Sequence, residues 1–345
     1  TWGTNKIILD SNGLNYQGNN DTYLIQYNTS GETVNIVYSG ATKGWIPLDD
    51  DSVADVAVDP PTQRGIFGYG YATLSMTNLV SSSGVVATDT TGVGTGRYGA
   101  GAGGYGGDKA IFGYGRVGSS DVSMTNLVNN SGVVASDVTG VGSVRREVAC
   151  ATYGTDKAIF GYGYSSSAQS VTNKVSNSGV VASDTSGVGT ARTRPAASGY
   201  GSSGQAIFAF GGENTTNVSN LVSNAGVVAS DTSGVGTARQ ALAATEYGGD
   251  KAIIAYGMES GQLSMSNLVS NSGVVATDTT GVGTARSWLA ATRYGGDKGI
   301  FGYGNTGSHV SLTNLVSSSG VIATDTTGVG TARIYLAAAG YSTSA

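Results

Sequence analysis

The chain has few of the side chains on which most enzyme chemistry depends. Its 345 residues include one cysteine, Cys150, and one histidine, His309. A single cysteine excludes an intrachain disulfide and a cysteine-rich metal site. A single histidine argues against a zinc site of the usual His/Cys kind and against a Ser-His-Asp triad. We therefore expect no enzyme activity, no catalytic residue, no metal and no cofactor, with Cys150 as a small buried filler.

Charge and long apolar runs are scarce as well. Charged residues make up 12% of the chain, and the net charge is −5 with no basic run. Nucleic acid would on average be repelled by such a surface. A membrane-spanning helix needs roughly 18 or more consecutive apolar residues, and no such stretch occurs. We expect neither nucleic-acid binding nor membrane insertion.

Glycine, by contrast, is abundant, with 56 residues. The stretches GTGRYG (94–99) and GAGGYG (101–106) fit the G-x-G-x-x-G pattern of dinucleotide-binding loops. That pattern needs a strand before it and a helix after it, and no helical pattern follows either stretch. There is also no G-K-[ST] sequence of a P-loop. The glycines are better explained as structural.

Most of the glycines belong to a unit that is repeated six times. The element IFGYG, or a variant of it, begins at Ile66, Ile111, Ile159, Ile207, Ile253 and Ile300, at intervals of 45 to 48 residues. Each copy predicts four short strands, which in the last full copy span 287–294, 299–304, 310–316 and 321–325. Four strands per period of this length are typical of one blade of a β-propeller. The sequence predicts an all-β, six-bladed propeller over residues 65–345.

The ends of the repeat array are complementary. The first copy begins at its second strand, whereas the last copy continues into ARIYLAAAGYSTSA (332–345), which matches a first strand. We expect this C-terminal strand to complete the first blade, which leaves no free edge for aggregation.

The repeat resembles the kelch repeat. The segment TARSWLAATRYGGDKGIFGYG (284–304) has an arginine, a small-residue strand and an apolar strand that ends in glycines, in the order of that family. Most copies have Gly-Tyr-Gly in place of the adjacent glycines, and the outer strand lacks the tryptophan usual in kelch repeats. The resemblance implies a kelch-like propeller.

Residues 1–47 do not match the repeat and predict a small β-rich anchoring module. We expect a hairpin over 22–40 with its turn at residues 28–31, followed by an acidic, proline-containing linker at 48–64. The segment VNIVYSGATKGWI (34–46) is similar to a module of structural and tail-fibre proteins of bacteriophages, particularly marine ones. This resemblance implies a virion component. Trp45 is interpreted as a core residue of the module rather than as a carbohydrate platform.

Every repeat carries one arginine, eight residues after an aspartate that occurs at the same position in each copy. The six arginines are Arg97, Arg145, Arg192, Arg239, Arg286 and Arg333. They could line the channel as a ring that holds an anion. Alternatively, each locks neighbouring blades by pairing with the aspartate eight residues before it or with backbone carbonyls. We favour the structural lock.

Variation among the six copies is concentrated in two segments. One is the loop between the second and third strands, and the other is the stretch directly after the arginine. In an up-and-down blade these segments lie at the same face, and repeat proteins commonly bind through such a face. The candidate ligand-binding residues there are Tyr71, Tyr98, Arg146, Glu147, Arg194, Glu213, Gln240, Glu259, Trp288, His309 and Tyr335.

These features predict a non-enzymatic, virion- or fibre-type binding protein, on a virion surface or extracellular, that recognises a host-surface glycan or protein. Other virion or fibre subunits would bind through the N-terminal module, and self-association is left open. One alternative is a structural decoration or assembly subunit of a virion or filament. The other is a polysaccharide-cleaving propeller, which needs two carboxylates about 5–10 Å apart across a cleft.

Overall fold

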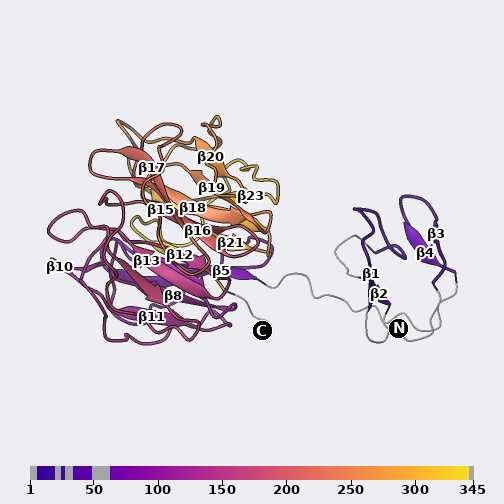
Figure 1. Cartoon of the computed structure of the whole chain (residues 1–345), viewed down its shortest axis with the longest axis horizontal. Helices are drawn as coiled ribbons and strands as arrows, with labels where there is room; N and C mark the ends of the chain where they lie inside the picture. The colour runs from indigo at the N-terminus through magenta and orange to yellow at the C-terminus, as the bar shows by residue number, and fades with distance from the viewer. Residues whose placement is uncertain (1–5, 20–24, 28–33, 49–62, 342–345) are drawn as a thin grey trace. The chain divides into compact units, whose positions relative to one another are not determined.

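The computed structural model describes residues 6–19, 25–27, 34–48 and 63–341 (Figure 1). The chain divides into two compact units, Thr1–Thr62 and Gln63–Ala345. The described residues form strands, turns and loops and contain no helix, so the all-β prediction is confirmed for them. Within these ranges no helix is long and apolar enough to cross a membrane.

The larger unit contains six antiparallel sheets of three strands each. The first strands, which follow the arginines, are β7 (Gly101–Tyr105), β12 (Ala149–Tyr153), β15 (Ala196–Tyr200), β18 (Ala243–Tyr247), β21 (Ala290–Tyr294) and β24 (Ala337–Tyr341). The middle strands, which carry the IFGYG element, are β8 (Lys109–Gly113), β13 (Lys157–Gly161), β16 (Gln205–Gly211), β19 (Lys251–Ala255), β22 (Lys298–Asn305) and β5 (Arg64–Gly70). The third strands are β11 (Thr125–Val128), β14 (Thr172–Val175), β17 (Thr216–Val222), β20 (Ser266–Val269), β23 (His309–Val316) and β6 (Leu74–Val80). A small hairpin of β9 (Arg116–Val117) and β10 (Ser120–Asp121) extends the loop after β8.

The C-terminal strand completes the sheet of the first repeat, as the sequence predicts. β24 pairs antiparallel with β5, with Ala337 opposite Gly68 and Tyr341 opposite Arg64. β6 pairs with the other edge of β5. Two segments separated by most of the chain therefore form one sheet.

The first strands of the six sheets are neighbours in a cyclic order. β7 contacts β12, and the contacts continue through β15, β18, β21 and β24, which contacts β7 again. All six of these strands contribute residues to the wall of one central cavity. These small antiparallel sheets are consistent with a β-propeller.

The prediction of a fourth regular strand in each repeat is wrong for the described chain. In the last full repeat, the segment 321–325 runs beside β23, with the isolated bridges Val316↔Ile322 and Thr313↔Thr326 and single hydrogen bonds such as Ala323 amide to Leu315 carbonyl in place of a regular ladder. The same two bridges recur in each of the other repeats. In this outer segment only Ile322 is buried, and residues 321 and 323–325 are exposed.

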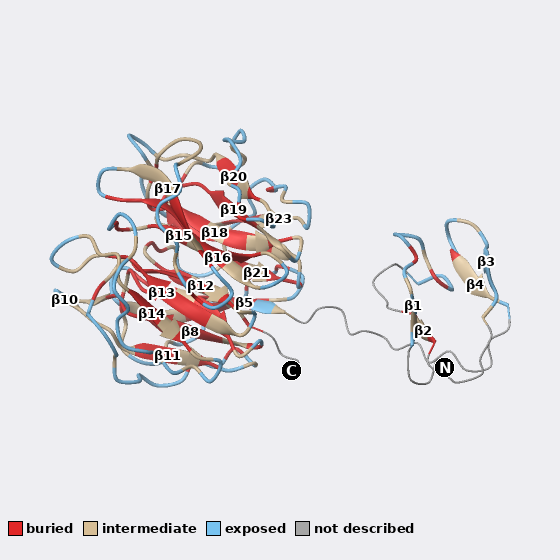
Figure 2. Cartoon of the chain, in the orientation of Figure 1, coloured by how far each residue is buried: buried red, intermediate tan, exposed pale blue. Residues whose placement is uncertain are grey.

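The hydrophobic core lies between neighbouring sheets. Figure 2 shows the buried residues concentrated along the strands and the exposed residues in the connecting loops. Phe160 of β13 packs on Gly113 of the preceding sheet, where a Cβ atom would lie 2.7 Å from the Phe160 Cζ. The ring of Tyr114 meets Phe160 edge-on, with centroids 5.1 Å apart. The glycine therefore makes room for the aromatic ring of the next sheet.

Among its described residues, the smaller unit has two antiparallel strand pairs rather than the one hairpin predicted at 22–40. β1 (Ile7–Leu9) pairs with β2 (Ile25–Tyr27), and β3 (Ile36–Tyr38) pairs with β4 (Trp45–Pro47). The predicted partners, β2 and β3, therefore belong to different hairpins. The predicted turn at 28–31 and most of the linker 48–64 lie outside the described residues.

The small core of this unit supports the structural interpretation of Trp45. Tyr16, Ile25 and Tyr27 are its buried residues, and Trp45 packs against them. The Trp45 ring also lies 5.4 Å from that of Tyr38, measured between ring centroids.

Candidate functional site

The two variable segments of each repeat lie side by side at one end of the sheets. Backbone bridges join them in four of the repeats: Tyr98↔Arg116, Arg146↔Tyr164, Gln240↔Met258 and Ser287↔Asn305. The turns between first and middle strands lie at the opposite ends of the same strands. The loop after each middle strand thus meets the residue after each arginine, and we call the surface that they share the variable face.

A ring of backbone hydrogen bonds underlies the variable face. Its members are the residues two positions after each arginine: Gly99, Glu147, Arg194, Ala241, Trp288 and Tyr335. In five of the six, all but Ala241, the amide donates to the carbonyl of its counterpart in the preceding repeat, in the bonds Glu147→Gly99, Arg194→Glu147, Trp288→Ala241, Tyr335→Trp288 and Gly99→Tyr335. The N···O distances run from 2.6 Å for Glu147 to 3.3 Å for Arg194. We call these six residues the rim.

All six rim residues have left-handed backbone conformations. Their φ angles are 65° for Gly99, 58° for Glu147, 55° for Arg194, 54° for Ala241, 59° for Trp288 and 55° for Tyr335. A residue with a Cβ is strained in this region by about 1–2 kcal/mol, and such strain is concentrated at functional sites. The rim therefore holds five side chains at fixed positions around the six first strands. Each of these five positions costs backbone conformational energy.

Arg194 is the hub of the side-chain contacts above the rim. Its Nε lies 2.9 Å from Oε2 of Glu147, and its Nη2 donates to Oε1 of the same carboxylate at 3.1 Å. Its Nη1 donates to Oε1 of Gln240 at 2.8 Å. The guanidinium also lies over the ring of Trp288, 4.6 Å from the centroid. Side chains from four repeats are held together by this one guanidinium.

Aromatic rings continue from Trp288 around the variable face. Trp288 stacks on Tyr335, with centroids 4.0 Å apart and an interplanar angle of 30°. Tyr335 meets Tyr98 at 5.8 Å, Tyr98 meets Tyr71 at 5.4 Å, and Tyr71 meets His309 at 6.3 Å. We call Trp288, Tyr335, Tyr98, Tyr71 and His309 the aromatic arc. Because Trp288 is already stacked within the chain, the accessible rings lie at the other end of the arc, where Tyr71 is 46% exposed.

Burial distinguishes the inner from the outer part of the arc. Burial, with a further contribution from the charge of Glu147, raises the pKa of Tyr335 to about 12. The phenol of Tyr335 is therefore neutral at any physiological pH. A cavity beneath it is lined by five apolar residues that follow the rim, namely Val148, Pro195, Leu242, Leu289 and Leu336, together with Ala100 and the rim itself.

Three of the predicted site residues lie outside this cluster. Arg146 forms an ion pair with Asp121 at 2.9 Å and lies over the ring of Tyr164. Glu213 and Glu259 are exposed. Within the described chain the Glu259 carboxylate accepts hydrogen bonds only from Ser260, from its amide and its hydroxyl. The structure does not bring Glu213 and Glu259 together with each other or with Glu147.

The six repeated arginines do not present a free ring of positive charge. Each is almost completely buried. The guanidinium of Arg145 lies over the Tyr114 ring of the preceding sheet, its Nε donates to the Tyr162 carbonyl, and its Nη2 donates to Oδ1 of Asn173. Burial lowers the pKa of Arg239 to about 10, so that this group remains protonated at neutral pH.

Each arginine approaches the aspartate of the following repeat rather than the expected one, which lies eight residues before it. Asp89 lies eight residues before Arg97, but its carboxylate is 3.8 Å from Nη1 of Arg333. Arg97 is instead 4.0 Å from Asp137, the aspartate of the following repeat. Each of these carboxylates also accepts bonds from the crossing segment, as Asp137 does from the Thr95 amide and hydroxyl. The pairing with the aspartate eight residues back was therefore wrong in its partner, whereas the bond to a backbone carbonyl is confirmed, for example from Arg97 Nε to Tyr114.

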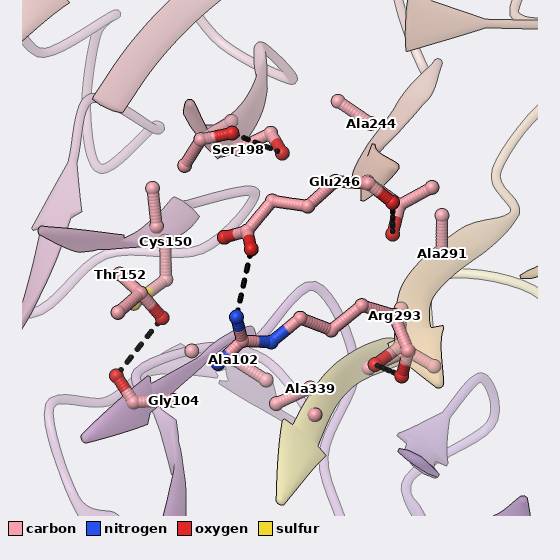
Figure 3. Close-up of a pocket in the computed structure, with 18 residues that line it drawn as sticks. Ala102, Gly104, Cys150, Thr152, Ser198, Ala244, Glu246, Ala291, Arg293 and Ala339 are labelled. Carbon is pink, nitrogen blue, oxygen red and sulfur yellow. Dashed lines mark hydrogen bonds and ion pairs between the residues drawn. The ribbon is translucent and has the colours of Figure 1, made fainter. Parts of the chain in front are cut away.

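The central cavity contains an ion pair that the sequence did not indicate. Glu246 of β18 and Arg293 of β21 project from adjacent strands into the cavity and meet at 2.8 Å (Figure 3). The Glu246 carboxylate lies against Gly199 on one side, and the Arg293 stem lies against Gly340 on the other, where a Cβ would be 2.3 Å and 2.8 Å away, respectively. The two long side chains thus fill space that neighbouring glycines leave, and we interpret the pair as structural.

Sequence reasoning missed several residues of the variable face. Tyr164 and Asp121 hold Arg146, while Gly99 and Ala241 complete the rim. The only sequence feature that could have pointed to these residues is their location in the two variable segments. Cys150 is buried, as expected, and burial raises the pKa of its thiol.

No group of three or more His, Cys, Asp or Glu side chains is placed to hold a metal ion in the part of the chain that the structure describes. The sequence matches no protein-family model and no curated protein.

Proposed function

We propose that residues 65–345 form a six-bladed, kelch-like β-propeller whose variable face binds a ligand without transforming it. The cyclic order of the first strands and the pairing of β24 with β5 support the propeller. The aromatic arc and the Arg194 contacts, set on a strained rim, support binding at the variable face. The aromatic arc is the single observation that carries the proposal, because it presents accessible aromatic rings on the face where the repeats differ.

The ligand is a glycan or a protein on the surface of a host cell, and the chain is a component of a virion or fibre. The likeness of residues 34–46 to phage structural modules supports this setting. The β3–β4 hairpin spans Ile36–Pro47 and so forms a compact local unit. A module that attaches the propeller to other virion or fibre subunits needs such a unit. The protein is then located on a virion surface or outside cells.

A binding assay tests the proposal. The full chain, fluorescently labelled, is applied to a glycan array and to a panel of bacterial cells, together with Trp288→Ala and the control Lys109→Ala. Trp288 holds Arg194 and Tyr335, so its loss should lower binding. Lys109 begins β8, next to the turn at the opposite end of the strands, with 41% of its side chain exposed, and its variant should bind as the wild type does.

The remaining outcomes separate the alternatives. If no cell and no glycan is bound, binding at the variable face is refuted. If native particles show this face buried between subunits, the chain is an assembly subunit instead. Release of reducing sugar from a host polysaccharide, abolished by Glu213→Gln or Glu259→Gln, would establish the enzyme alternative.

A further inference from the structure

We infer that the outer end of the aromatic arc, formed by Tyr98, Tyr71 and His309, binds an uncharged sugar residue and discriminates against anionic glycans. This inference rests on the proposed function and gives its ligand a chemical class. Three properties of the variable face support this inference: the accessible rings, their free hydroxyls, and the pairing of its arginines with carboxylates of the same chain.

The accessible rings have the chemistry that sugars require. Sugar rings present patches of C–H groups beside hydroxyls, and aromatic side chains offer a large apolar surface with a polar edge. Tyr71 and Tyr98 come from two variable segments, the loop after β5 and the stretch after Arg97, and their rings meet at an interplanar angle of 79°. Two rings nearly at right angles form a corner, which suits a bulky ring-shaped ligand better than a flat or extended one.

The hydroxyls of these tyrosines are available to a ligand. Within the described chain, Tyr71, Tyr98 and Tyr335 make ring contacts, but no hydrogen bond involves their phenol oxygens. The tyrosines of the IFGYG elements differ, since Tyr114 donates its hydroxyl to the carbonyl of Val141. A phenol both donates and accepts a hydrogen bond, so the corner can satisfy sugar hydroxyls of either polarity.

The three arginines of the variable face are paired with two carboxylates of the chain itself, so that only one positive charge is left without its own carboxylate. Glu147 pairs with Arg194 at 2.9 Å, and Asp121 pairs with Arg146 at 2.9 Å and with Arg116 at 3.4 Å. The Glu147 and Asp121 side chains are only 7% and 11% exposed, so solvent screens these pairs weakly.

Negative charge on the same face also disfavours an anion. Glu213 and Glu259 are exposed and form no ion pair within the described residues. These two carboxylates add negative charge to the face without a paired cation, and an anionic competitor for Arg194 or Arg146 would have to break a formed pair. Charge therefore selects against acidic glycans at this face.

The inner end of the arc positions the outer end. Trp288 is held between Tyr335 and Arg194, and Tyr335 in turn contacts Tyr98. Trp288 and Tyr335 also belong to the rim, whose backbone bonds fix their Cα positions. Binding then requires little rearrangement, which preserves affinity for a small ligand.

The test compares glycans that differ only in charge. An array carries neutral oligosaccharides beside the same cores with a terminal sialic acid, uronic acid or sulfate, and hits are titrated by calorimetry with the full chain at 50 and 500 mM NaCl. The variants are Tyr71→Ala, Tyr98→Ala and Tyr98→Phe. Tyr164→Ala is the matched control, because Tyr164 is a variable-face aromatic residue that contacts Arg146 outside the arc. Circular dichroism and the thermal midpoint confirm that each variant is folded.

We expect neutral glycans to bind more tightly than their acidic counterparts, with affinities that change less than twofold between the two salt concentrations. Tyr98→Ala and Tyr71→Ala should each weaken binding about tenfold, Tyr98→Phe by a smaller factor, and Tyr164→Ala by less than twofold.

Preferential binding of acidic glycans that weakens in salt overturns the inference and leaves the proposed function intact. The same holds if cells are bound in a Trp288-dependent manner while no glycan is. Unchanged neutral-sugar binding in folded Tyr71→Ala and Tyr98→Ala overturns the assignment of the arc. Absence of any binding overturns the proposed function as well.

Discussion

Arg333 and Asn78 are 255 residues apart in the chain, yet Nη2 of Arg333 donates a hydrogen bond to Oδ1 of Asn78 at 2.7 Å. The same guanidinium donates from Nε to the Tyr69 carbonyl at 2.9 Å. Both partners belong to the first repeat, and Arg333 follows the last. The arginine contact that joins each pair of neighbouring sheets therefore also joins the two ends of the repeat array.

Removal of this contact should destabilise the larger unit. We expect Arg333→Ala to lower the free energy of unfolding by about 3 kcal/mol, because it leaves Asn78 and the Tyr69 carbonyl buried without their donor. Arg333→Lys should recover only part of the loss, since an ammonium cannot reproduce the planar set of donors. Urea unfolding followed by tryptophan fluorescence measures both variants. Arg116→Ala, at a partly exposed arginine, is the control and should change stability by less than about 1 kcal/mol; an equal effect of the two alanine variants would contradict the prediction.

Stability should fall in acid because of the repeated aspartates. For Asp89, burial acts to raise the pKa, but hydrogen bonds from Thr331 and Asn78 and the charge of Arg333 lower it, and the net pKa lies below the usual 3.8. The other five have the same shift with equivalent partners. A folded-state pKa below the unfolded value contributes stability that is fully present above about pH 4 and is lost as the pH falls through the lower, folded-state pKa.

The variant Asp89→Asn isolates this contribution. Wild type should be the more stable at pH 7, and the difference in thermal midpoint should shrink as the pH is lowered from 5 to 2. Differential scanning calorimetry at a series of pH values gives the difference directly. A difference that stays constant down to pH 2 would show that the ionised carboxylate is not what stabilises the contact.

Gly113 should not tolerate a side chain. A Cβ there would lie 2.7 Å from Cζ of Phe160, a packed ring of the next sheet, and overpacking of this kind destabilises by about 1–3 kcal/mol. Gly261 provides the control, because a Cβ there meets no atom within 4 Å and its φ is not in the left-handed region. Chemical denaturation should find Gly113→Ala destabilised and Gly261→Ala unchanged or slightly stabilised. Equal stability of the two variants would refute this account of sheet packing.

Gly99→Ala tests the strain in the rim. Gly99 is the one glycine among the six rim residues, with φ of 65°. A methyl group would impose the left-handed strain that the other five positions already have, about 1 kcal/mol, and it would lie 3.1 Å from the Glu147 amide nitrogen. The expected loss should appear in the free energy of unfolding measured by urea titration. No loss relative to Gly261→Ala would mean that the rim is not strained at this position.

Repetition made the regular part of the fold predictable. The middle strand expected at 299–304 is β22, Lys298–Asn305, and the pairing of the C-terminal strand with the first repeat followed from matching 332–345 to a first strand. The first strand expected at 287–294 begins only at Ala290. The residues before it, including Trp288, turn into the rim instead, and a left-handed conformation at tryptophan has no signature in sequence.

The errors have a common physical origin. Asp89 and Asp137 have the same sequence surroundings, so the spacing of eight residues could not tell which of them Arg97 approaches. β2 and β3 alternate like the two strands of a hairpin, but each has a different partner. The ion pair of Glu246 with Arg293 arises between adjacent first strands, at positions where other repeats have glycine or threonine. Contacts between units depend on three-dimensional neighbours, which local periodicity does not encode.

The pairing of β5 with β24 also dictates when the molecule can finish folding. β5 emerges from the ribosome early, but its inner edge stays unpaired until Ala337–Tyr341 has been synthesised. At typical elongation rates of ~5–20 residues per second, this interval lasts on the order of tens of seconds. During that time the growing chain carries an open β-edge at its first sheet and a second one at its newest sheet. A nascent chain of this kind is therefore at risk of joining its neighbours on the same polysome until its own last strand arrives.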